Sequence, residues 1–116
     1  MSGKPFPKSK QLARGAKRYH RKVASPKQWQ ALSDAKMGPC RVCGHRRGIM
    51  HLHHLVDRVH GGDDVADNLV PLCWLCHDAI TAGVAHAHAV LDGNLTGPER
   101  AYVARRSRSE ARRNRA

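Results

Sequence analysis

The chain contains 116 residues, of which 41% are hydrophobic, but it has only one Phe, two Trp and two Tyr. Such a sequence is expected to form one domain with a modest core, and small cores commonly depend on a metal ion. No apolar run approaches the length of a membrane span, which argues against a membrane protein. A net charge of +12 and a pI near 10.5 imply a polyanionic partner, with nucleic acid as the first candidate.

Residues 1–24 are predicted to form a basic, flexible arm. Eight Lys or Arg and no acid occur among the first 22 residues, and two prolines and a glycine interrupt any helix there. Such an arm can follow a phosphate backbone. The alternative is a charge run that serves only solubility or stays disordered.

The next segment, residues 26–36, is predicted to be a helix. Ser25 is a suitable N-cap, Pro26 suits the first turn, and Gln28 occupies the capping-box position. Trp29 would share one face of this helix with the leucine three residues later.

Four cysteines follow in two CxxC pairs, and the sequence has no other cysteine. Each pair offers two thiolates from one tight turn, and two such turns complete the tetrahedral shell that zinc prefers. No apolar leader segment points to an oxidising compartment, so a structural Zn²⁺ site is expected in preference to disulfides or free thiols. The predicted ligands are Cys40, Cys43, Cys73 and Cys76.

Between and after the two cysteine pairs, the sequence predicts a strand, a long loop, a second strand and a helix. Alternation along the first strand places His53 and His54 on opposite faces. Two adjacent glycines interrupt the loop, and a proline confines the second strand to an edge or a strand end. The predicted ranges are 49–56 and 68–72 for the strands and 74–82 for the helix, which Gly83 ends.

A basic C-terminal segment, residues 96–116, is predicted to start as a helix and to fray toward its end. Thr96 and the Gly-Pro-Glu that follows are typical of a helix start. The central domain would then span residues 25–95. No element is predicted between Gly83 and Thr96, where His86 and His88 raise the minor alternative of a surface metal site.

Residues 53–77 read HHLVDRVHGGDDVADNLVPLCWLCH, and this string resembles the HNH nuclease motif. The resemblance covers roughly residues 40–83 and implies an α+β protein, a small ββα-metal domain held by a four-cysteine zinc site, flanked by helices and basic tails. Two positions depart from the family pattern: Asp57 stands where many members have proline, and no lysine follows His77 closely. Neither change removes a residue that the chemistry requires.

The same resemblance implies roles for individual residues. His53 and His77 would bind a catalytic divalent ion, and His54 would be the general base. Asn68 would tie the loop together and so keep His54 aimed. Separately from the resemblance, Arg58 follows the two histidines along the chain and is a candidate clamp for the phosphate, although a nonspecific DNA contact explains a loop arginine in so basic a chain equally well.

Imidazole ligands favour Mn²⁺, Ni²⁺, Co²⁺ or Zn²⁺ over Mg²⁺ at the catalytic position, so Mn²⁺ or Ni²⁺ is expected to support activity best. The third ligand stays open among His51, Asp78 and Thr81. Trp74, inside the second CxxC, is expected to pack in the core beside the zinc.

The resemblance therefore implies a metal-dependent endonuclease that hydrolyses DNA phosphodiester bonds with low intrinsic sequence specificity. The alternative is a non-catalytic zinc module that binds DNA or RNA. Short stand-alone proteins of this kind resemble those encoded by bacteriophages, which implies action in the host cytoplasm beside terminase or other packaging proteins. A mobile-element or host-defence nuclease is the other expectation. The sequence predicts neither the oligomeric state nor nicking versus double-strand cleavage.

Overall fold

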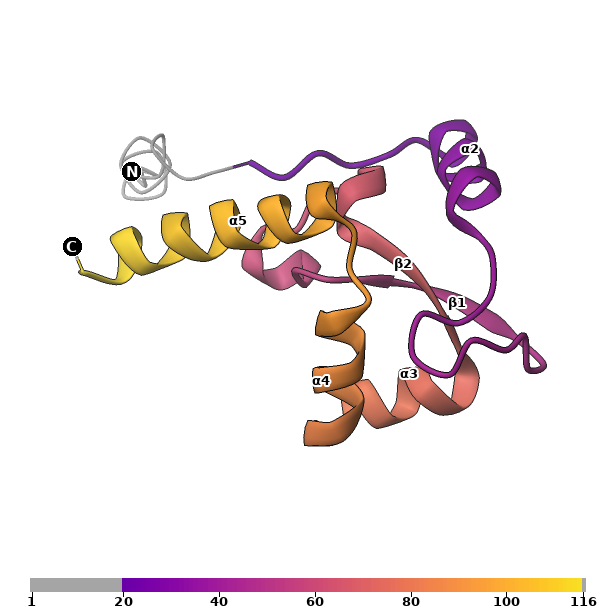
Figure 1. Ribbon diagram of the computed structural model, residues 1–116. Helices are drawn as coiled ribbons and strands as arrows, with labels where there is room; N and C mark the ends of the chain where they lie inside the picture. Colours follow the sequence, from indigo (N-terminus) through magenta and orange to yellow (C-terminus); the bar gives the residue numbers. More distant parts are fainter. Residues whose placement is uncertain (1–19, 116) are drawn as a thin grey trace, which may run out of the picture.

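The computed structural model describes residues 20–115, with side chains described as far as Ser107. The predicted arm thus lies outside the described residues except for its last five. Along the chain the structure contains helix α2, strand β1, two short 3₁₀ turns, strand β2 and three further helices (Figure 1). The bounds are α2 Pro26–Lys36, β1 Met50–His54, η2 Arg58–His60, η3 Ala66–Asn68, β2 Leu69–Cys73, α3 Trp74–Thr81, α4 Ala85–Gly93 and α5 Gly97–Arg115.

Strands β1 and β2 form an antiparallel hairpin, and α3 follows β2 without a break, so the predicted α+β class is confirmed. The register pairs Met50 with Cys73 and His54 with Leu69. Every residue of β2 is buried, which makes this strand the centre of the core. Pro71 is tolerated because its strand has only one hydrogen-bonded neighbour, and its carbonyl accepts a bond from Arg41 N–H (3.0 Å).

Helix α2 has the predicted bounds and the predicted cap. The Ser25 hydroxyl accepts from the Gln28 N–H (3.2 Å), and the Gln28 side chain accepts from the Ser25 N–H (2.8 Å). This reciprocal pair satisfies two backbone donors at the start of the helix. The helix packs against β2 and η3, so it lies beside the hairpin and its long loop.

Helix α4 is an element that the sequence analysis did not predict. Its AHAHAV stretch alternates like a strand, but Ala87 and Leu91, four residues apart, are the positions it buries. Both join the core cluster with Ile80 of α3. Gly83, with φ 80°, provides the left-handed turn between α3 and α4.

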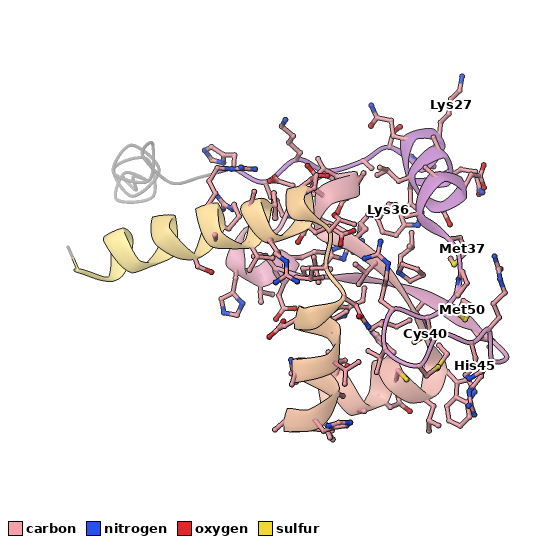
Figure 2. All side chains as sticks on the ribbon, in the orientation of Figure 1. Lys27, Lys36, Met37, Cys40, His45 and Met50 are labelled. Atoms are coloured by element: carbon pink, nitrogen blue, oxygen red, sulfur yellow. The ribbon has the colours of Figure 1, made fainter. Side chains whose placement is uncertain are left out.

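Helix α5 is fixed to the rest of the molecule at its first turn. The Glu99 side chain accepts from Thr96 N–H (2.8 Å) and from the Lys36 ammonium (2.6 Å), and the Arg41 guanidinium donates to it at 2.7 and 3.0 Å. Figure 2 shows Lys36 reaching inward from α2, whereas Lys27 points away from the molecule. Glu99 thereby joins α2, the first cysteine pair and α5. None of the helices in residues 20–115 has the length and apolarity that a bilayer crossing would need.

The last residues of the predicted arm, 20–24, form an extended strap across the loop between β1 and β2. Arg21 donates to the carbonyl of Gly62 (2.8 Å), and the Asp64 N–H donates to the carbonyl of Lys22 (2.9 Å). The N–H of Lys22 donates to the Asp63 carboxylate (2.6 Å). Residues 20–24, called the strap below, are therefore held by main-chain and side-chain bonds.

Candidate functional site

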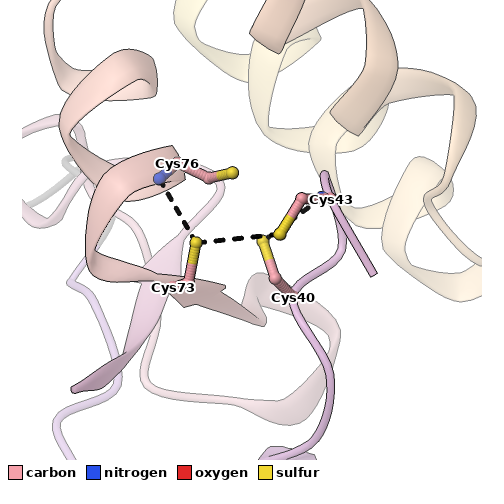
Figure 3. Close-up of side chains that lie close together, drawn as sticks. All are labelled: Cys40, Cys43, Cys73 and Cys76. Atoms are coloured by element: carbon pink, nitrogen blue, oxygen red, sulfur yellow. Dashed lines mark hydrogen bonds between the residues drawn. The ribbon is translucent and has the colours of Figure 1, made fainter. Parts of the chain in front are cut away.

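The two CxxC pairs meet at one end of the hairpin. The first pair lies in a tight turn over residues 40–45, called the knuckle, in which the Cys40 N–H donates to the His45 carbonyl (3.0 Å). The second pair lies at the junction of β2 and α3. Figure 3 shows the four side chains facing one another across this junction. Within residues 20–107, this is the one group of three or more possible metal ligands whose donor atoms all lie within 4.8 Å of one another.

The spacing of these sulfur atoms fits a tetrahedral ion. Cys43 Sγ and Cys73 Sγ are 3.8 Å apart, and a tetrahedron with Zn–S bonds of about 2.3 Å has an S–S edge of roughly 3.8 Å. All four cysteines are free thiols in the structure. The four cysteines are therefore positioned to form a site for a structural metal ion such as zinc.

The thiols of Cys40 and Cys76 differ in pKa. Burial alone would raise the pKa of Cys40, but the Cys43 and Val42 N–H groups, at 3.5 and 3.4 Å from its sulfur, help to bring that pKa down to about 6. Burial and the neighbouring sulfurs raise the pKa of Cys76. Four thiolates at this spacing repel one another, so a divalent cation is needed to hold all four ionised.

A second site, formed by histidines, lies where residues of α2, β1, η2 and α3 come together. An open cleft of about 470 Å³ is lined by residues from α2, β1, η2 and α3 and from the loop between β1 and β2. His53, His54 and His77 line it together. The lining residues are Trp29, Leu52, His53, His54, Asp57, Arg58, Val59, His77 and Thr81.

His53 and His77 are neighbours in this cleft. Their rings meet edge to face with centroids 5.5 Å apart, and the His77 ring also stacks on His51 at 4.7 Å. Burial, and to a smaller degree the charge of His77, lower the pKa of His53 to about 4 against the opposing effect of Asp57. His53 is therefore neutral near pH 7, which is the state that a metal ligand requires.

His54 points away from His51 and His53, as alternation along a strand requires. Its ring stacks on Trp29 of α2, with centroids 5.8 Å apart and planes 15° apart. Its Nε2 lies 2.8 Å from Oδ1 of Asp64. The ring is thus held on one face by an indole and at one nitrogen by a carboxylate.

Asp64 is a buried carboxylate at the centre of a charged cluster. Its side chain is only 3% exposed and receives the Arg21 guanidinium, with Arg58 Nε at 3.8 Å. Burial alone would raise the pKa of Asp64, but the bonds from the Ala24 N–H and His54 and the charges of the two arginines lower it below its usual value. The group is therefore a carboxylate near pH 7.

Asn68 is fully buried and bonds to both arms of the loop between β1 and β2. Its side-chain oxygen accepts from the Val56 N–H (2.8 Å), and its amide donates to the carbonyls of Val56 (3.1 Å) and Asp63 (2.9 Å). Leu55 N–H also donates to the Asn68 carbonyl (2.9 Å). These bonds hold the loop close to the end of β1, because Val56 lies only two residues after His54.

Arg58 lies at the mouth of the cleft with its side chain 57% exposed. Its guanidinium carbon sits 5.6 Å above the Trp29 ring. The same indole therefore contacts both Arg58 and His54, and it leaves the charged end of Arg58 open to solvent.

Trp74 corrects one expectation. It does not pack in the core beside the cysteines but is 48% exposed, with its ring against the backbone of Gly48. The reason is helical geometry: Cys73 and Cys76 are three residues apart and share one side of the first turn of α3, so the residues between them face outward.

The structure does not bring the other candidate metal ligands together. His86 and His88 are two residues apart on α4 and so lie on different faces, and His88 Nε2 is 2.9 Å from the carbonyl of Ile80. Thr81 lines the cleft, and Asp78 is exposed on α3. Among the described residues, no third His, Cys, Asp or Glu forms a group with His53 and His77 in which all donor atoms lie within 4.8 Å of one another.

Two residues that contact His54 were assigned no role from the sequence. Trp29 was expected only to share a face of its helix with a leucine, and Asp64 carried no expectation. Neither has a local sequence signal that points to His54, because both contacts depend on how α2 and the loop fold onto β1.

Comparison with known proteins adds one match. Residues 40–83 match the family model described as HNH endonuclease. The matched segment contains the four cysteines, the hairpin and α3 but less than half of the chain; the strap, α2, α4 and α5 lie outside it. No curated protein matches the chain. No solved structure matches it either.

Proposed function

We propose that the protein is a metal-dependent endonuclease that hydrolyses phosphodiester bonds in DNA, because residues 40–83 match the HNH endonuclease family model. The observation that carries the proposal is the cleft in which His53 and His77 lie edge to face while His54, turned the other way along the strand, reaches the same cavity. A zinc module that only binds nucleic acid has no need of this arrangement.

His54 is the proposed general base. One ring nitrogen contacts Asp64, and in the neutral ring the other nitrogen carries a lone pair. This second nitrogen can take a proton from water as the water oxygen attacks phosphorus. Stacking on Trp29 restrains rotation of the ring. The chain thus supplies a base whose plane and hydrogen-bond partner are set before substrate arrives.

His53 and His77 are the proposed ligands of the catalytic ion, which could be Mn²⁺, Ni²⁺, Co²⁺, Zn²⁺ or Mg²⁺. Two imidazoles beside an open cleft fit a divalent ion that also needs room for phosphate and water oxygens. When bound, the ion supplies Lewis acidity, neutralising the charge that develops on the phosphate and the leaving 3′ oxygen.

Asn68 and Arg58 have supporting roles in the proposal. Asn68 positions the loop and the end of β1 through its buried bonds and does not touch substrate. Arg58 donates to a phosphate oxygen from the mouth of the cleft, where its exposed guanidinium is already oriented by Trp29.

The four cysteines have a separate, structural role in the proposal. Their zinc site joins the knuckle to the β2–α3 junction and so fixes His77, one residue after Cys76, relative to the hairpin. We propose the bounds 25–95 for this zinc-stapled domain, with residues 1–24 and 96–116 as basic segments that contact DNA.

The net charge of +12 supports DNA as the substrate, because phosphate contacts by lysine and arginine bind DNA of any sequence. The residues outside 40–83 are too few and too basic to form a separate specificity domain, so we propose low intrinsic sequence specificity. A role beside terminase in bacteriophage DNA packaging, within the cytoplasm of the host, is the biological setting that we propose.

Plasmid cleavage tests the function directly. Chelator-washed protein that still holds its zinc is supplied with Mg²⁺, Mn²⁺, Ni²⁺ or Zn²⁺ separately, and wild type is compared with His54→Ala and with the control His86→Ala on the exposed face of α4. We expect metal-dependent cutting that His54→Ala lowers by about 100-fold or more and the control leaves unchanged. Cutting by His54→Ala at the wild-type rate would remove His54 from the mechanism, and intact plasmid with salt-sensitive binding would support the non-catalytic module.

A further inference from the structure

His54, which lines the cleft, makes a short polar contact with Asp64. Nε2 and Oδ1 are 2.8 Å apart, and the side chains are 12% and 3% exposed. A carboxylate can only accept at this contact, so the imidazole nitrogen must donate. The neutral ring therefore carries its hydrogen on Nε2 and its lone pair on Nδ1.

The Asp64 carboxylate is itself held on all sides. Its Oδ2 accepts from the Ala24 N–H (2.9 Å), its Oδ1 accepts from Arg21 as well as from His54, and its own N–H donates to the Lys22 carbonyl (2.9 Å). Three of these bonds come from the strap. A buried side chain with this many partners has one orientation, so it can fix the group that it contacts.

We propose that Asp64 is the positioning residue for the general base: it fixes His54 in the tautomer with hydrogen on Nε2, so that Nδ1 receives the proton. This inference rests on the proposed function. Asp64 touches neither substrate nor metal and acts only through His54. When Nδ1 has taken the proton, the same carboxylate stabilises the imidazolium that forms.

Trp29 completes the restraint on the ring. Asp64 fixes one atom of the imidazole, but a ring held at one atom can still tilt about that bond. The Trp29 indole, stacked at 15° on the imidazole, removes this tilt. The two restraints come from different parts of the chain, and Trp29 lies outside the segment that matches the family model.

The strap gives the inference a second consequence. Because Arg21 and Ala24 orient Asp64, residues before the matched segment reach the base through one side chain. The strap and the family-matched segment are then one functional unit, and the bonds from Arg21 and Ala24 to the Asp64 carboxylate help to set the rate as well as the stability.

The test is the ring tautomer of His54, read from nitrogen-15 correlations of the imidazole in the full-length, zinc-loaded protein without added divalent ion. We expect wild type to show hydrogen on Nε2. Asp64→Asn is expected to give a mixture of tautomers and to lower kcat by roughly 10- to 100-fold while KM changes by less than about 3-fold.

Asp63→Asn is the matched control. Asp63 is also buried and also accepts an N–H from the strap, but its carboxylate bonds to Tyr102 (2.7 Å) and not to His54. Its substitution should alter stability to a similar degree, measured by thermal unfolding, and leave both the tautomer and kcat as in wild type.

Hydrogen on Nδ1 of His54 in the wild-type protein would overturn the inference. This measurement uses wild type alone, so it does not depend on whether any variant folds. Asp64→Asn with an unchanged tautomer and an unchanged kcat would overturn it as well. If wild type cuts no DNA under any metal, the proposed function fails, and the ring spectra still decide whether Asp64 sets the tautomer.

Discussion

The guanidinium of Arg41 donates two hydrogen bonds, of 2.7 and 3.0 Å, to the carboxylate of Glu99. Arg41 lies inside the first CxxC and Glu99 in the first turn of α5, 58 residues later. The pair therefore links the cysteine cluster to the C-terminal helix. The Glu99 side chain is only 1% exposed, so its partners replace nearly all of its hydration.

Glu99→Gln is expected to destabilise the protein by about 2 to 3 kcal/mol at pH 7, because Arg41 and Lys36 would lose their shared counter-ion. Denaturant unfolding of the zinc-loaded protein measures the difference. Asp34→Asn, which alters an exposed carboxylate bonded only to Gln30 on the same helix, is the control and should change stability by less than about 0.5 kcal/mol. Equal stability of Glu99→Gln and wild type would contradict the proposed link.

The advantage of wild type over Glu99→Gln should depend on pH. Burial opposes ionisation, but Arg41 and Lys36 prevail and hold the pKa of Glu99 at about 2, against its ordinary value of 4.5. The unfolded chain thus binds a proton first as the pH falls. The advantage, at most about 3 kcal/mol, should be constant above pH 4.5 and decline from there toward pH 2. The comparison is made over the pH range in which both proteins keep their zinc; an advantage that grows on acidification would reverse the sign.

Zinc removal should unfold the domain. Structural zinc contributes roughly 10 to 16 kcal/mol of apparent binding free energy in small zinc domains, whereas a whole domain is stable by about 5 to 15 kcal/mol. We expect one zinc ion per chain by elemental analysis and loss of cooperative unfolding after chelation, recovered when zinc returns.

Cys73→Ser should reproduce that loss, because Cys73 is fully buried and its sulfur also accepts from the Cys76 N–H at the start of α3. A metal-free protein with an unchanged melting transition would contradict the structural role of zinc.

The choice of catalytic metal follows from the ligands. With His53 and His77 as the protein ligands, cleavage should be faster with Mn²⁺ or Ni²⁺ than with Mg²⁺, because imidazole binds those ions more strongly than it binds Mg²⁺. Initial cleavage rates across a series of ion concentrations provide the measurement. A maximal rate with Mg²⁺ well above the rates with the other ions would argue against this ligand set.

The Gly-Gly turn gives a backbone prediction. A Cβ at Gly62 would lie 1.7 Å from the Val56 carbonyl oxygen and 2.9 Å from that of Asp57, so the loop must move to admit it. Gly62→Ala should therefore disrupt the Asp64 contacts, cost at least about 1 to 3 kcal/mol and abolish cleavage.

Gly38→Ala is the control for that substitution, because nothing lies within 4 Å of its Cβ position. It should stay within about 0.5 kcal/mol of wild type and keep its activity. Wild-type stability and cleavage in Gly62→Ala would show that the loop is not held as the structure describes.

Local signals in the sequence predicted most elements correctly. The capping box gave α2 its bounds, and the two CxxC pairs identified the metal cluster. The first strand was predicted to run to Val56 but ends at His54, because the Asn68 side chain takes over the bonds of Val56. Helix α4 was missed because its apolar positions alternate locally, and only packing on Ile80 selects the helical face.

The sequence by itself determined the chemistry available to this protein: the order of the metal-binding residues, the alternation that turns His53 and His54 apart, and the charge that calls for a polyanion. Only the tertiary structure decided what surrounds the proposed base. Asp64 lies ten residues from His54 and Trp29 lies on another helix, and their contacts form when the strap and α2 close over the loop. Such contacts depend on long-range packing, whereas caps, turns and paired ligands depend on neighbours along the chain.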